Sequence, residues 1–372
     1  MIARKIEQIL AQAGVAINGS QPWDIQVHDK RWFRRVLFEK NLGLGESYMD
    51  GWWDCEQLDE MIYRLLRNGL ENHVKGGLRY LLHFIPGLVF NLQSRARSHI
   101  IAERHYDLDN ELFLSFLDAN HQYSCAYFDS TNDLDEAQRK KLDLIARKLQ
   151  ISKEDHLLDI GCGWGGLSRY FAEKYGCKVT AVNISREQLE HAKKICEGLP
   201  VSFHDCDYRE IDGIFDKAVS VGMFEHVGSR NYRTFMDVVH SSLKEDGIFL
   251  LHTIGSNVSR SNCDPWINKY IFPNGMLPSQ KQIAKEAENL FVIEDVHNLG
   301  PHYDKTLMAW NRKFQSAWAW LSRKYNSRFK RMWEYYLLSC AGAFRARNIQ
   351  VWQILMTKHG CGTPQPCYRL QR

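Results

Sequence analysis

The 372-residue chain lacks several features that would assign it to a specialised class of protein. Its first seven residues contain no apolar run of the kind found in a secretory signal peptide. The longest apolar run, residues 81–92, is interrupted by His83, Pro86 and Asn91 and is too short to span a bilayer. We therefore expect a cytoplasmic protein that is soluble or, at most, peripherally associated with a membrane surface.

The chain also lacks a strong charge excess and any metal-binding cysteine pattern. Lys and Arg number 48 against 44 Asp and Glu, and a net charge of +4 gives no reason to expect a nucleic-acid partner. The 10 cysteines form neither a C-x-x-C pair nor a Cys/His set with zinc spacing, so no metal is predicted. Cys162, Cys177 and Cys196 fall inside predicted core elements, which favours reduced thiols over disulfides.

The most informative stretch is the apolar run 157–160, which leads into the turn Gly161-Cys162-Gly163-Trp164-Gly165-Gly166. A buried parallel strand has such a continuous apolar sequence. Glycines allow the backbone to approach a ligand closely, and a helix predicted over 167–175 would point its free N–H groups at that ligand. An ordinary tight strand-to-helix turn is the simpler alternative.

Asp159, at the end of this predicted strand, narrows the choice of ligand. The spacing differs from the dinucleotide-binding G-x-G-x-x-G, and a carboxylate at this place would repel a pyrophosphate. S-adenosylmethionine fits better, because it carries a sulfonium, an α-amino group and a ribose but no phosphate. The whole string resembles the first motif of class I methyltransferases, which implies that Asp159, Gly161, Gly163 and Gly165 bind this cofactor.

From residue 156 onward, strand and helix patterns alternate. Strands are predicted at 156–161, 178–184, 201–207, 215–223, 247–255, 291–298 and 349–356. The pattern predicts an α/β fold with a doubly wound, seven-stranded, Rossmann-like class I methyltransferase sheet that binds its ligand at the carboxyl ends of the strands. This catalytic domain is assigned to residues 106–372, and an insertion at about 256–290 is predicted to form a lid or substrate wall.

Residues 1–105 are predicted to form a smaller, mostly helical, lipid-interacting domain. Helical patterns cover 1–14 and 58–70, and the glycines and aromatics of 43–53 suggest a turn-rich corner between them. Residues 75–104 combine an apolar face with basic neighbours, as in segments that lie in a lipid interface. A core helix kinked at Pro86 is the alternative for this segment.

Longer motifs make the resemblance more specific. They are Gly43 to Trp53, Gln122 to Phe128, Val219 to Gly228, Leu250 to Gly255, Asp264 to Gly275, Tyr303 to Trp310 and Cys340 to Arg345. In this order they resemble the cyclopropane-fatty-acyl-phospholipid synthases, a family that includes the mycolic acid cyclopropane synthases. The resemblance implies transfer of a methylene group from S-adenosylmethionine to a cis double bond in a phospholipid acyl chain, through a carbocation that closes to a cyclopropane ring.

The resemblance also implies a set of catalytic residues. The carbocation would lose its proton to a bicarbonate held by Cys125, Glu225, His252, Tyr303 and the backbone N–H of Ile254. Donors of these types suit an anion, and an ionised Glu225 would increase the basicity of that anion. A capping acid and a satisfied core histidine are the alternatives for Glu225 and His252. Cys340 matches a position once assigned as the active-site cysteine, but its small neighbours favour packing.

For the cofactor, the resemblance implies contacts from Tyr123, Ser124, Asn183, Ser185, Gln188, Cys206 and Asp207. Tyr123 and Ser124 would lie near the methionine end and Gln188 near the ribose. Asn183 stands where many methyltransferases have an acid, and Cys206 stands where the family more often has Gln. A dry cavity for the carbocation could be built from the aromatic residues Trp266, Tyr270, Phe272, Trp310, Trp318 and Trp320.

The expected partners are an unsaturated phospholipid in a bilayer, at the inner face of the cell membrane, and a second copy of the chain. Seven cations between residues 323 and 347 outnumber the single acid Glu334 and predict a surface that attracts anionic lipids. Three alternatives stay open: a methyltransferase for a soluble small molecule, a C-methyltransferase that adds a methyl branch without closing a ring, and a non-catalytic lipid-binding protein.

Overall fold

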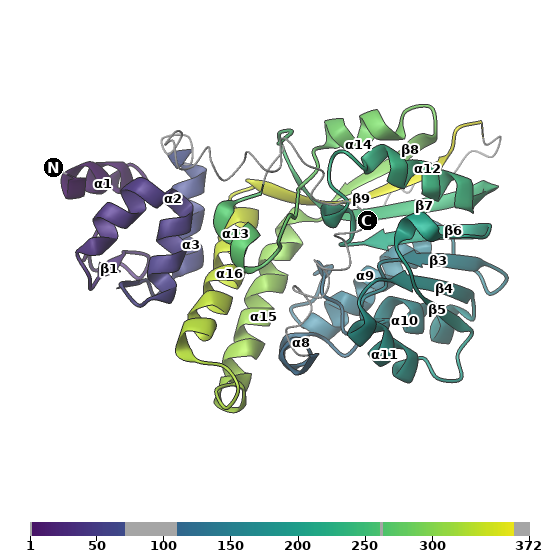
Figure 1. Ribbon diagram of the computed structural model, residues 1–372, viewed down its shortest axis with the longest axis horizontal. Coiled ribbons are helices and arrows are strands. Elements are labelled where there is room, and N and C mark those ends of the chain that lie inside the picture. Colours follow the sequence, from purple (N-terminus) through teal and green to yellow (C-terminus); the bar gives the residue numbers. More distant parts are fainter. Residues whose placement is uncertain (1, 71–109, 261–262, 361–372) are drawn as a thin grey trace. The chain divides into compact units, whose positions relative to one another are not determined.

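The computed structural model describes residues 2–70, 110–260 and 263–360, which form two compact units (Figure 1). The first unit combines the N-terminal helices with the segment around residues 263–273 and with Tyr303–Ile349. The second contains the large sheet and its covering helices. The predicted domain boundary near residue 105 lies outside the described residues and stays a prediction. The first unit, however, is assembled from segments that are far apart in sequence.

The second unit is built on a seven-stranded sheet in the order β5-β4-β3-β6-β7-β9-β8. Its strands are β3 His156–Ile160, β4 Lys178–Asn183, β5 Val201–Asp205, β6 Phe215–Val221, β7 Leu243–Ser256, β8 Phe291–Asn298 and β9 Ile349–Lys358. Strands β5 to β7 pair in parallel, whereas β8 pairs antiparallel with β9. The predicted α/β class and strand number are confirmed, but the sheet is mixed because the last two strands run in opposite directions.

Helices cover both faces of this sheet (Figure 1). They are α9 Leu134–Leu149, α10 Gly166–Tyr175, α11 Arg186–Ile195, α12 Tyr232–Ser242 and α14 Gln280–Ala287, with the shorter α8 Asn110–Phe116 nearby in the chain. In β3, Leu157 joins the core cluster of α9 to α11, while Leu158 and Ile160 join the cluster of α12 and α14. Both faces of the strand are therefore buried, which explains its continuous apolar sequence.

The first unit is mostly helical. Its elements are α1 Ile2–Ala11, β1 Gln26–Val27, α2 Arg31–Met49, β2 Trp53–Asp54, α3 Leu58–Arg67, α13 Pro265–Tyr270, most of α15 Gly300–Leu321 and α16 Ser327–Arg345. The α3 and α16 helices lie in close contact at Gly342, where a Cβ would come within 2.4 Å of the Asp59 carbonyl oxygen. The predicted N-terminal helices at 1–14 and 58–70 are thus confirmed, and both pack through their buried faces.

The prediction of a turn-rich corner at residues 43–53 was wrong for its first half. Helix α2 continues through Met49, and its backbone departs from helical angles at Lys40, where φ is 57°. Gly45 lies inside the helix, and a Cβ there would be 2.4 Å from the Trp266 ring. The glycine is therefore needed for a close approach of α13 and not for a turn. A sequence pattern cannot distinguish these two uses of glycine.

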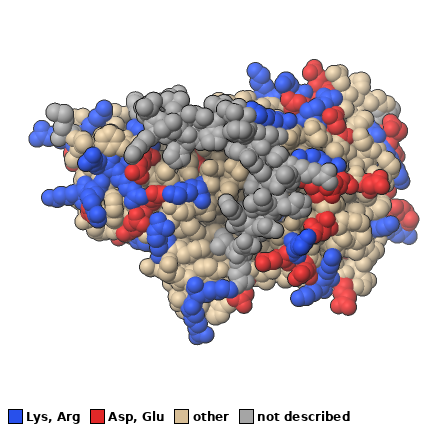
Figure 2. All heavy atoms as spheres, viewed as in Figure 1, with Lys and Arg blue, Asp and Glu red and all other residues tan. Residues whose placement is uncertain are grey.

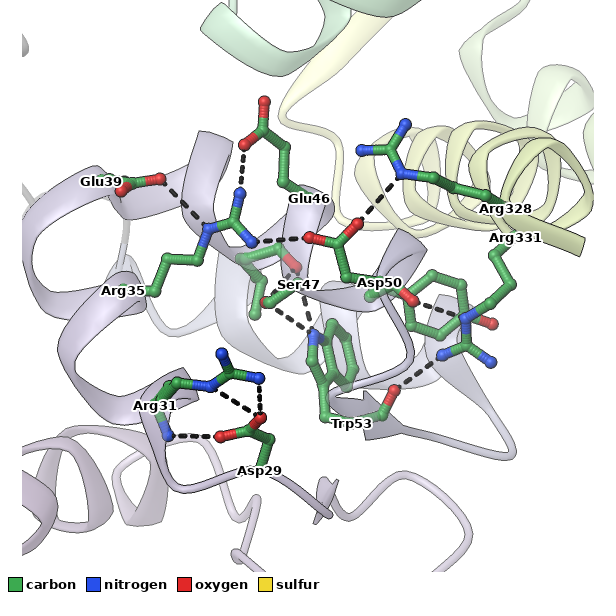
Figure 3. A network of polar contacts seen from close by, with 12 residues as sticks. Asp29, Arg31, Arg35, Glu39, Glu46, Ser47, Asp50, Trp53, Arg328 and Arg331 are labelled. Atoms are coloured by element: carbon green, nitrogen blue, oxygen red, sulfur yellow. Dashed lines mark hydrogen bonds and ion pairs between the residues drawn. The ribbon is translucent and has the colours of Figure 1, made fainter.

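The predicted basic surface between residues 323 and 347 is largely paired within the first unit. The Arg328 guanidinium lies 3.0 Å from Asp50 (Figure 3). The Arg331 guanidinium lies 2.7 Å from Asp54. Arg345 contacts Asp304 at 3.0 Å and Asp59 at 2.7 Å. On the face shown in Figure 2, basic and acidic atoms are interspersed over the N-terminal helices at the left end. The acids that pair with these arginines, Asp50, Asp54, Asp59 and Asp304, lie elsewhere in the sequence. Counting charges along residues 323–347 alone therefore overestimated the free positive charge.

The segment predicted as a lid or wall is anchored to α2. Glu46 accepts hydrogen bonds from Lys269 Nζ at 2.6 Å and from the Tyr270 hydroxyl at 2.8 Å, and its other oxygen pairs with Arg35 (Figure 3). None of the helices among the described residues is long and apolar enough to cross a bilayer. The lipid-interface prediction for residues 75–104 lies outside the described residues.

We predict that Gly45→Ala destabilises the protein, although alanine favours helices. The added methyl group would overlap the Trp266 ring, and overpacking of this kind costs about 1–3 kcal/mol. Urea unfolding followed by tryptophan fluorescence measures the effect. Lys40→Gly is the matched control, because its positive φ suits glycine and this variant should be at least as stable as the parent. Equal stability of Gly45→Ala and the parent would contradict the close approach.

Candidate active site

The glycine-rich turn lies at the carboxyl end of β3, as predicted. The N–H groups of Gly161 and Cys162 donate to the Val182 carbonyl oxygen at 2.9 and 3.1 Å, which ties the turn to β4. Gly163 has a φ of 54°, and a Cβ there would meet no other atom within 4 Å. The turn therefore presents open backbone at Gly163. A side chain at this position would occupy the space into which a ligand could fit.

Asp159 lies beneath this turn and is almost completely buried. Its Oδ2 accepts a hydrogen bond from the Ser168 hydroxyl at 2.7 Å. Burial raises the pKa of Asp159 to about 6, while the Ser168 hydrogen bond and the charge of Lys141 counteract the rise. The carboxylate is thus mostly ionised at neutral pH, in a place that suits a cationic group of a ligand.

Tyr123 and Ser124 lie in a segment that crosses the start of α10. A Cβ on Gly166 would come within 1.6 Å of the Asn120 carbonyl oxygen, so the backbone of this segment touches the helix at its first residue. The Tyr123 ring packs against Phe113, with centroids 5.1 Å apart, and its edge faces Trp164 at 6.3 Å. The structure therefore brings Tyr123 to the glycine-rich turn, whereas its contact with the cofactor stays a prediction.

Two polar residues of α9 support this segment and were not predicted. Gln138 Nε2 donates to the Ser124 carbonyl oxygen at 2.9 Å, and Lys141 Nζ donates to the Ser124 hydroxyl at 2.9 Å. Both side chains are fully buried. The sequence could have indicated that these two polar side chains are buried, because Gln138 and Lys141 share the helical face of the buried residues Leu134 and Ile145.

The residues after β4 and β5 form a second part of the predicted cofactor site. Asn183 Nδ2 donates to Gln188 Oε1 at 2.9 Å, and the Ser185 side chain caps α11 by accepting from the Gln188 N–H. Asp207 is buried, and its two carboxylate oxygens accept hydrogen bonds from Arg209 at 2.7 and 3.0 Å. Cys206 is partly buried, and burial raises the pKa of its thiol.

These observations fit S-adenosylmethionine better than a phosphorylated cofactor. The buried Asp159 carboxylate beneath the turn favours a cation, and the open backbone at Gly163 leaves room for a ligand. The amide side chains of Asn183 and Gln188 provide polar groups of the kind that bind ribose hydroxyls. Among the described residues there is no cluster of side chains that could hold a metal ion.

Glu225 follows β6 in the short helix η2 Phe224–His226, next to the end of β7. Its Oε1 accepts a hydrogen bond from the Ile254 N–H at 2.6 Å. Its Oε2 is buried and has no hydrogen-bond partner among the described residues. Burial raises the pKa of Glu225 to about 7, so the group is poised between its charged and neutral forms near neutral pH.

His252 and Cys125 lie in the same unit. His252 is buried in β7, and its Nδ1 lies 3.4 Å from Nε2 of Gln353 in β9. Burial lowers the pKa of His252 well below its usual value, so the ring is neutral at physiological pH. The buried Cys125 thiol lies 3.7 Å from the Leu299 carbonyl oxygen. Gln353 was not predicted, because nothing in a strand sequence marks which polar residue faces a histidine.

Tyr303 and Cys340 belong to the first unit and are described there. The Tyr303 ring packs against Phe344 and Trp310, with centroids 4.6 and 5.9 Å apart. Burial raises the pKa of Cys340 to about 12, so its thiol is protonated at neutral pH, which supports packing. Trp266 and Trp310 are buried, whereas Trp320 is 45% exposed and does not suit the wall of a dry cavity.

The chain is similar to known proteins along most of its length. A family model described as mycolic acid cyclopropane synthetase matches residues 93–354. The chain is 52% identical over 355 residues to the cyclopropane-fatty-acyl-phospholipid synthase of Escherichia coli (strain K12), covering 95% of this chain and 93% of that protein. It is 32% identical over 351 residues to the tuberculostearic acid methyltransferase UfaA1 of Mycobacterium tuberculosis, covering 88% and 81%.

A solved structure is similar in fold and sequence. The mycolic acid cyclopropane synthase CmaA1, complexed with SAH and CTAB, matches with a TM-score of 0.65 and 32% identity. The match covers 70% of this chain and 98% of that chain. S-adenosylhomocysteine (SAH) is the product left when S-adenosylmethionine has given up its methyl group, so the similar structure binds this class of cofactor.

We predict that Gly163→Val abolishes binding of S-adenosylhomocysteine, because the side chain would fill the open space at the turn. Gly198→Val is the matched control, since Gly198 also has a positive φ and open space but lies beyond α11. Both variants should lose roughly 1–2 kcal/mol of stability from the left-handed backbone. Calorimetry should show lost binding for Gly163→Val alone, and retained binding there would mean that the turn does not hold the cofactor.

We also predict that Glu225→Gln changes how stability depends on pH. The pKa of Glu225 in the folded protein is raised from 4.5 to about 7. Ionisation of Glu225 therefore lowers the free energy of unfolding by up to about 3 kcal/mol as the pH rises through this interval. Glutamine cannot ionise, so the variant should gain stability relative to the parent at about pH 8 compared with about pH 5. Urea unfolding at both values measures this, and a pH-independent difference would refute the raised pKa.

Proposed function

The chain belongs to the mycolic acid cyclopropane synthetase family of S-adenosylmethionine-dependent enzymes, and from this premise we propose its reaction. It transfers a methylene group from S-adenosylmethionine to the cis double bond of an unsaturated acyl chain in a membrane phospholipid, forming a cyclopropane ring. The observation that carries the proposal is the 52% identity to the Escherichia coli phospholipid synthase along 95% of the chain.

A second candidate is methyl branching of an unsaturated lipid without ring closure. The 32% identity to a tuberculostearic acid methyltransferase over 88% of this chain supports it. The higher identity to the cyclopropane synthase favours ring closure. A methyltransferase for a soluble small molecule has weaker support, because the relatives named above carry lipid names.

The residues of the second unit have distinct tasks in this proposal. The bound cofactor supplies an electrophilic methyl group. Asp159 attracts the cofactor's amino group, and the open backbone at Gly163 lets the cofactor approach the turn. An alkene is a weak nucleophile, so holding the reacting groups in line is the main task of the protein and can contribute roughly 7–11 kcal/mol.

We further propose that bicarbonate binds beside Glu225, His252, Cys125 and the Ile254 N–H, where it would supply a base. The sequence resemblance adds Tyr303 as a further donor, and this assignment stays a prediction. The orphan Oε2 of Glu225 supports the bicarbonate site, as does a neutral His252 that can donate an N–H without adding a charge. The Ile254 N–H already donates to Glu225, so an anion would have to share that donor.

A bound anion also changes what is expected of Glu225. A neighbouring negative charge raises a carboxyl pKa that burial already brings to about 7. We therefore propose that Glu225 is protonated beside the anion and donates a hydrogen bond from Oε2, whereas the sequence alone suggested a charged Glu225. Cys340 has no task here, because a buried, protonated thiol among small residues fits packing.

The location is part of the same proposal. A phospholipid substrate requires the enzyme to act at a bilayer, so we propose a cytoplasmic protein that binds peripherally to the inner face of the cell membrane, as a homodimer. Electrostatic attraction from residues 323–347 now has less support, because much of that charge is paired. Membrane contact through residues 75–104 stays a prediction.

The reaction can be tested with methyl-labelled S-adenosylmethionine and phosphatidylglycerol vesicles. Label should enter lipid with unsaturated acyl chains and not lipid with fully saturated chains. Mass spectrometry after reduction of residual double bonds separates the two candidates, since a ring product has no double bond left to reduce. Label in a branched, still unsaturated chain would replace the first candidate with the second, and no transfer to lipid would refute both.

The proposed proton on Glu225 gives a separate test. Glu225→Met removes the donor to the anion, and the loss of one such preorganised donor lowers turnover by roughly 10²-fold or more. Glu225→Gln keeps an N–H donor and should stay within about ten-fold of the parent. Both variants should bind S-adenosylhomocysteine normally. If glutamine is as inactive as methionine, charge or proton exchange at Glu225 matters and not hydrogen-bond donation.

A further inference from the structure

Lys141 is a fully buried lysine on the inner face of α9. Its Nζ donates hydrogen bonds to Gln122 Oε1 at 2.5 Å and to the Ser124 hydroxyl at 2.9 Å. Burying an ammonium group costs considerable free energy unless the group is well compensated. A lysine on the apolar stripe of a core helix therefore needs an explanation beyond folding.

A second lysine of the same helix has a different setting. Lys148 is also buried, two turns further on, and its Nζ lies 2.8 Å from a carboxylate oxygen of Asp295 in β8. Lys148 thus joins helix to sheet through a direct ion pair. The hydrogen-bond partners of Lys141, in contrast, are two neutral side chains that flank Tyr123.

The charge of Lys141 acts on the groups at the cofactor site. It interacts electrostatically with Asp118, Cys125 and Asp159, and it also acts on His252. Asp118 also holds this segment, because its oxygens accept hydrogen bonds from the N–H groups of Asn120 and Gln122 at 2.8 Å each. Lys141 is therefore hydrogen-bonded to the segment that carries Tyr123 and Ser124, and its charge acts on Asp159 at the end of β3.

We propose that Lys141 is a positioning residue of the cofactor site. Its ammonium group holds Gln122 and Ser124, and with them Tyr123, and its positive charge keeps Asp159 ionised to receive the amino group of the cofactor. This inference rests on the proposed cofactor site and adds a residue to it.

The titration of the surrounding groups is consistent with this arrangement. Burial lowers the pKa of Lys141 to about 8, which leaves the group mostly charged at neutral pH. Besides Lys141, the titratable groups facing Asp159 are the thiols of Cys162 in the turn and Cys196 at the end of α11. Burial raises the pKa of both thiols, so they are neutral. Among these groups, Lys141 supplies the positive charge.

The test is the binding of S-adenosylhomocysteine, measured by calorimetry on the full chain from about pH 5 to about pH 8. Affinity in the parent should fall below about pH 6, as Asp159 takes up a proton. In Lys141→Met the midpoint of this fall should move up by about one unit, so that affinity is about two-fold lower at pH 7 and close to ten-fold lower at about pH 5. A merely structural lysine would not move this midpoint.

Two further variants separate the effect of the Lys141 hydrogen bonds from the effect of its charge. Lys141→Gln restores a hydrogen-bond donor without the charge, so affinity at about pH 8 should recover while the midpoint stays shifted. Lys148→Met is the matched control and should leave affinity and midpoint unchanged, although it leaves Asp295 without its partner. Removing one partner of a buried charge pair destabilises a protein, so thermal unfolding must show that each variant is folded at the temperature of the binding experiment.

The outcomes are distinct. A parental midpoint and affinity in Lys141→Met would overturn the inference. If Lys141→Met does not fold, Lys141→Gln decides, because an unshifted midpoint there would overturn it equally. If the parent protein itself does not bind S-adenosylhomocysteine, the proposed cofactor site fails, and Lys141 is not at issue.

Discussion

The second unit depends on two carboxyl groups that are buried at the carboxyl ends of the adjacent strands β3 and β6. Asp159 accepts a hydrogen bond from a serine hydroxyl, and Glu225 accepts one from a backbone N–H. Because these donors are neutral, burial raises the pKa of both acids, to about 6 and about 7. A buried acid without a cation in hydrogen-bond contact lowers the stability of the folded protein. Such acids are found mainly at functional sites.

The parallel sheet explains why these groups come together. The carboxyl ends of parallel strands meet along one edge of the sheet, so the turn after β3, the short helix after β6 and the end of β7 are neighbours. The segment around Ser124 then closes on the start of α10, held by Lys141 and Gln138 from α9. The fold thus places two buried acids, Asp159 and Glu225, at or just beyond the carboxyl ends of adjacent strands.

The first unit uses charge in the opposite way. Arg345 is flanked by Asp304 and Asp59, and Glu46 is shared by Arg35, Lys269 and Tyr270. Figure 3 shows the contact of Glu46 with Arg35. Carboxylates that contact cations so directly stay ionised, and the pKa of Glu46 is lowered despite burial. These networks join segments that are distant in sequence, such as α2 with α13. The acids of the first unit are paired with cations, whereas Asp159 and Glu225 of the second unit accept hydrogen bonds from neutral donors.

Local sequence patterns determined the strands, most helices and the glycine-rich turn, because apolar periodicity and glycine spacing follow from backbone geometry alone. They also placed Asp159 and Glu225 at strand ends. Tertiary structure alone decided which distant groups meet. The Trp266 ring against Gly45, the acids that pair the cations of α16, and Lys141 beside Ser124 all depend on contacts between elements. A linear pattern records which side chains are buried, but the charge state and task of a buried group depend on neighbours that only the folded chain brings to it.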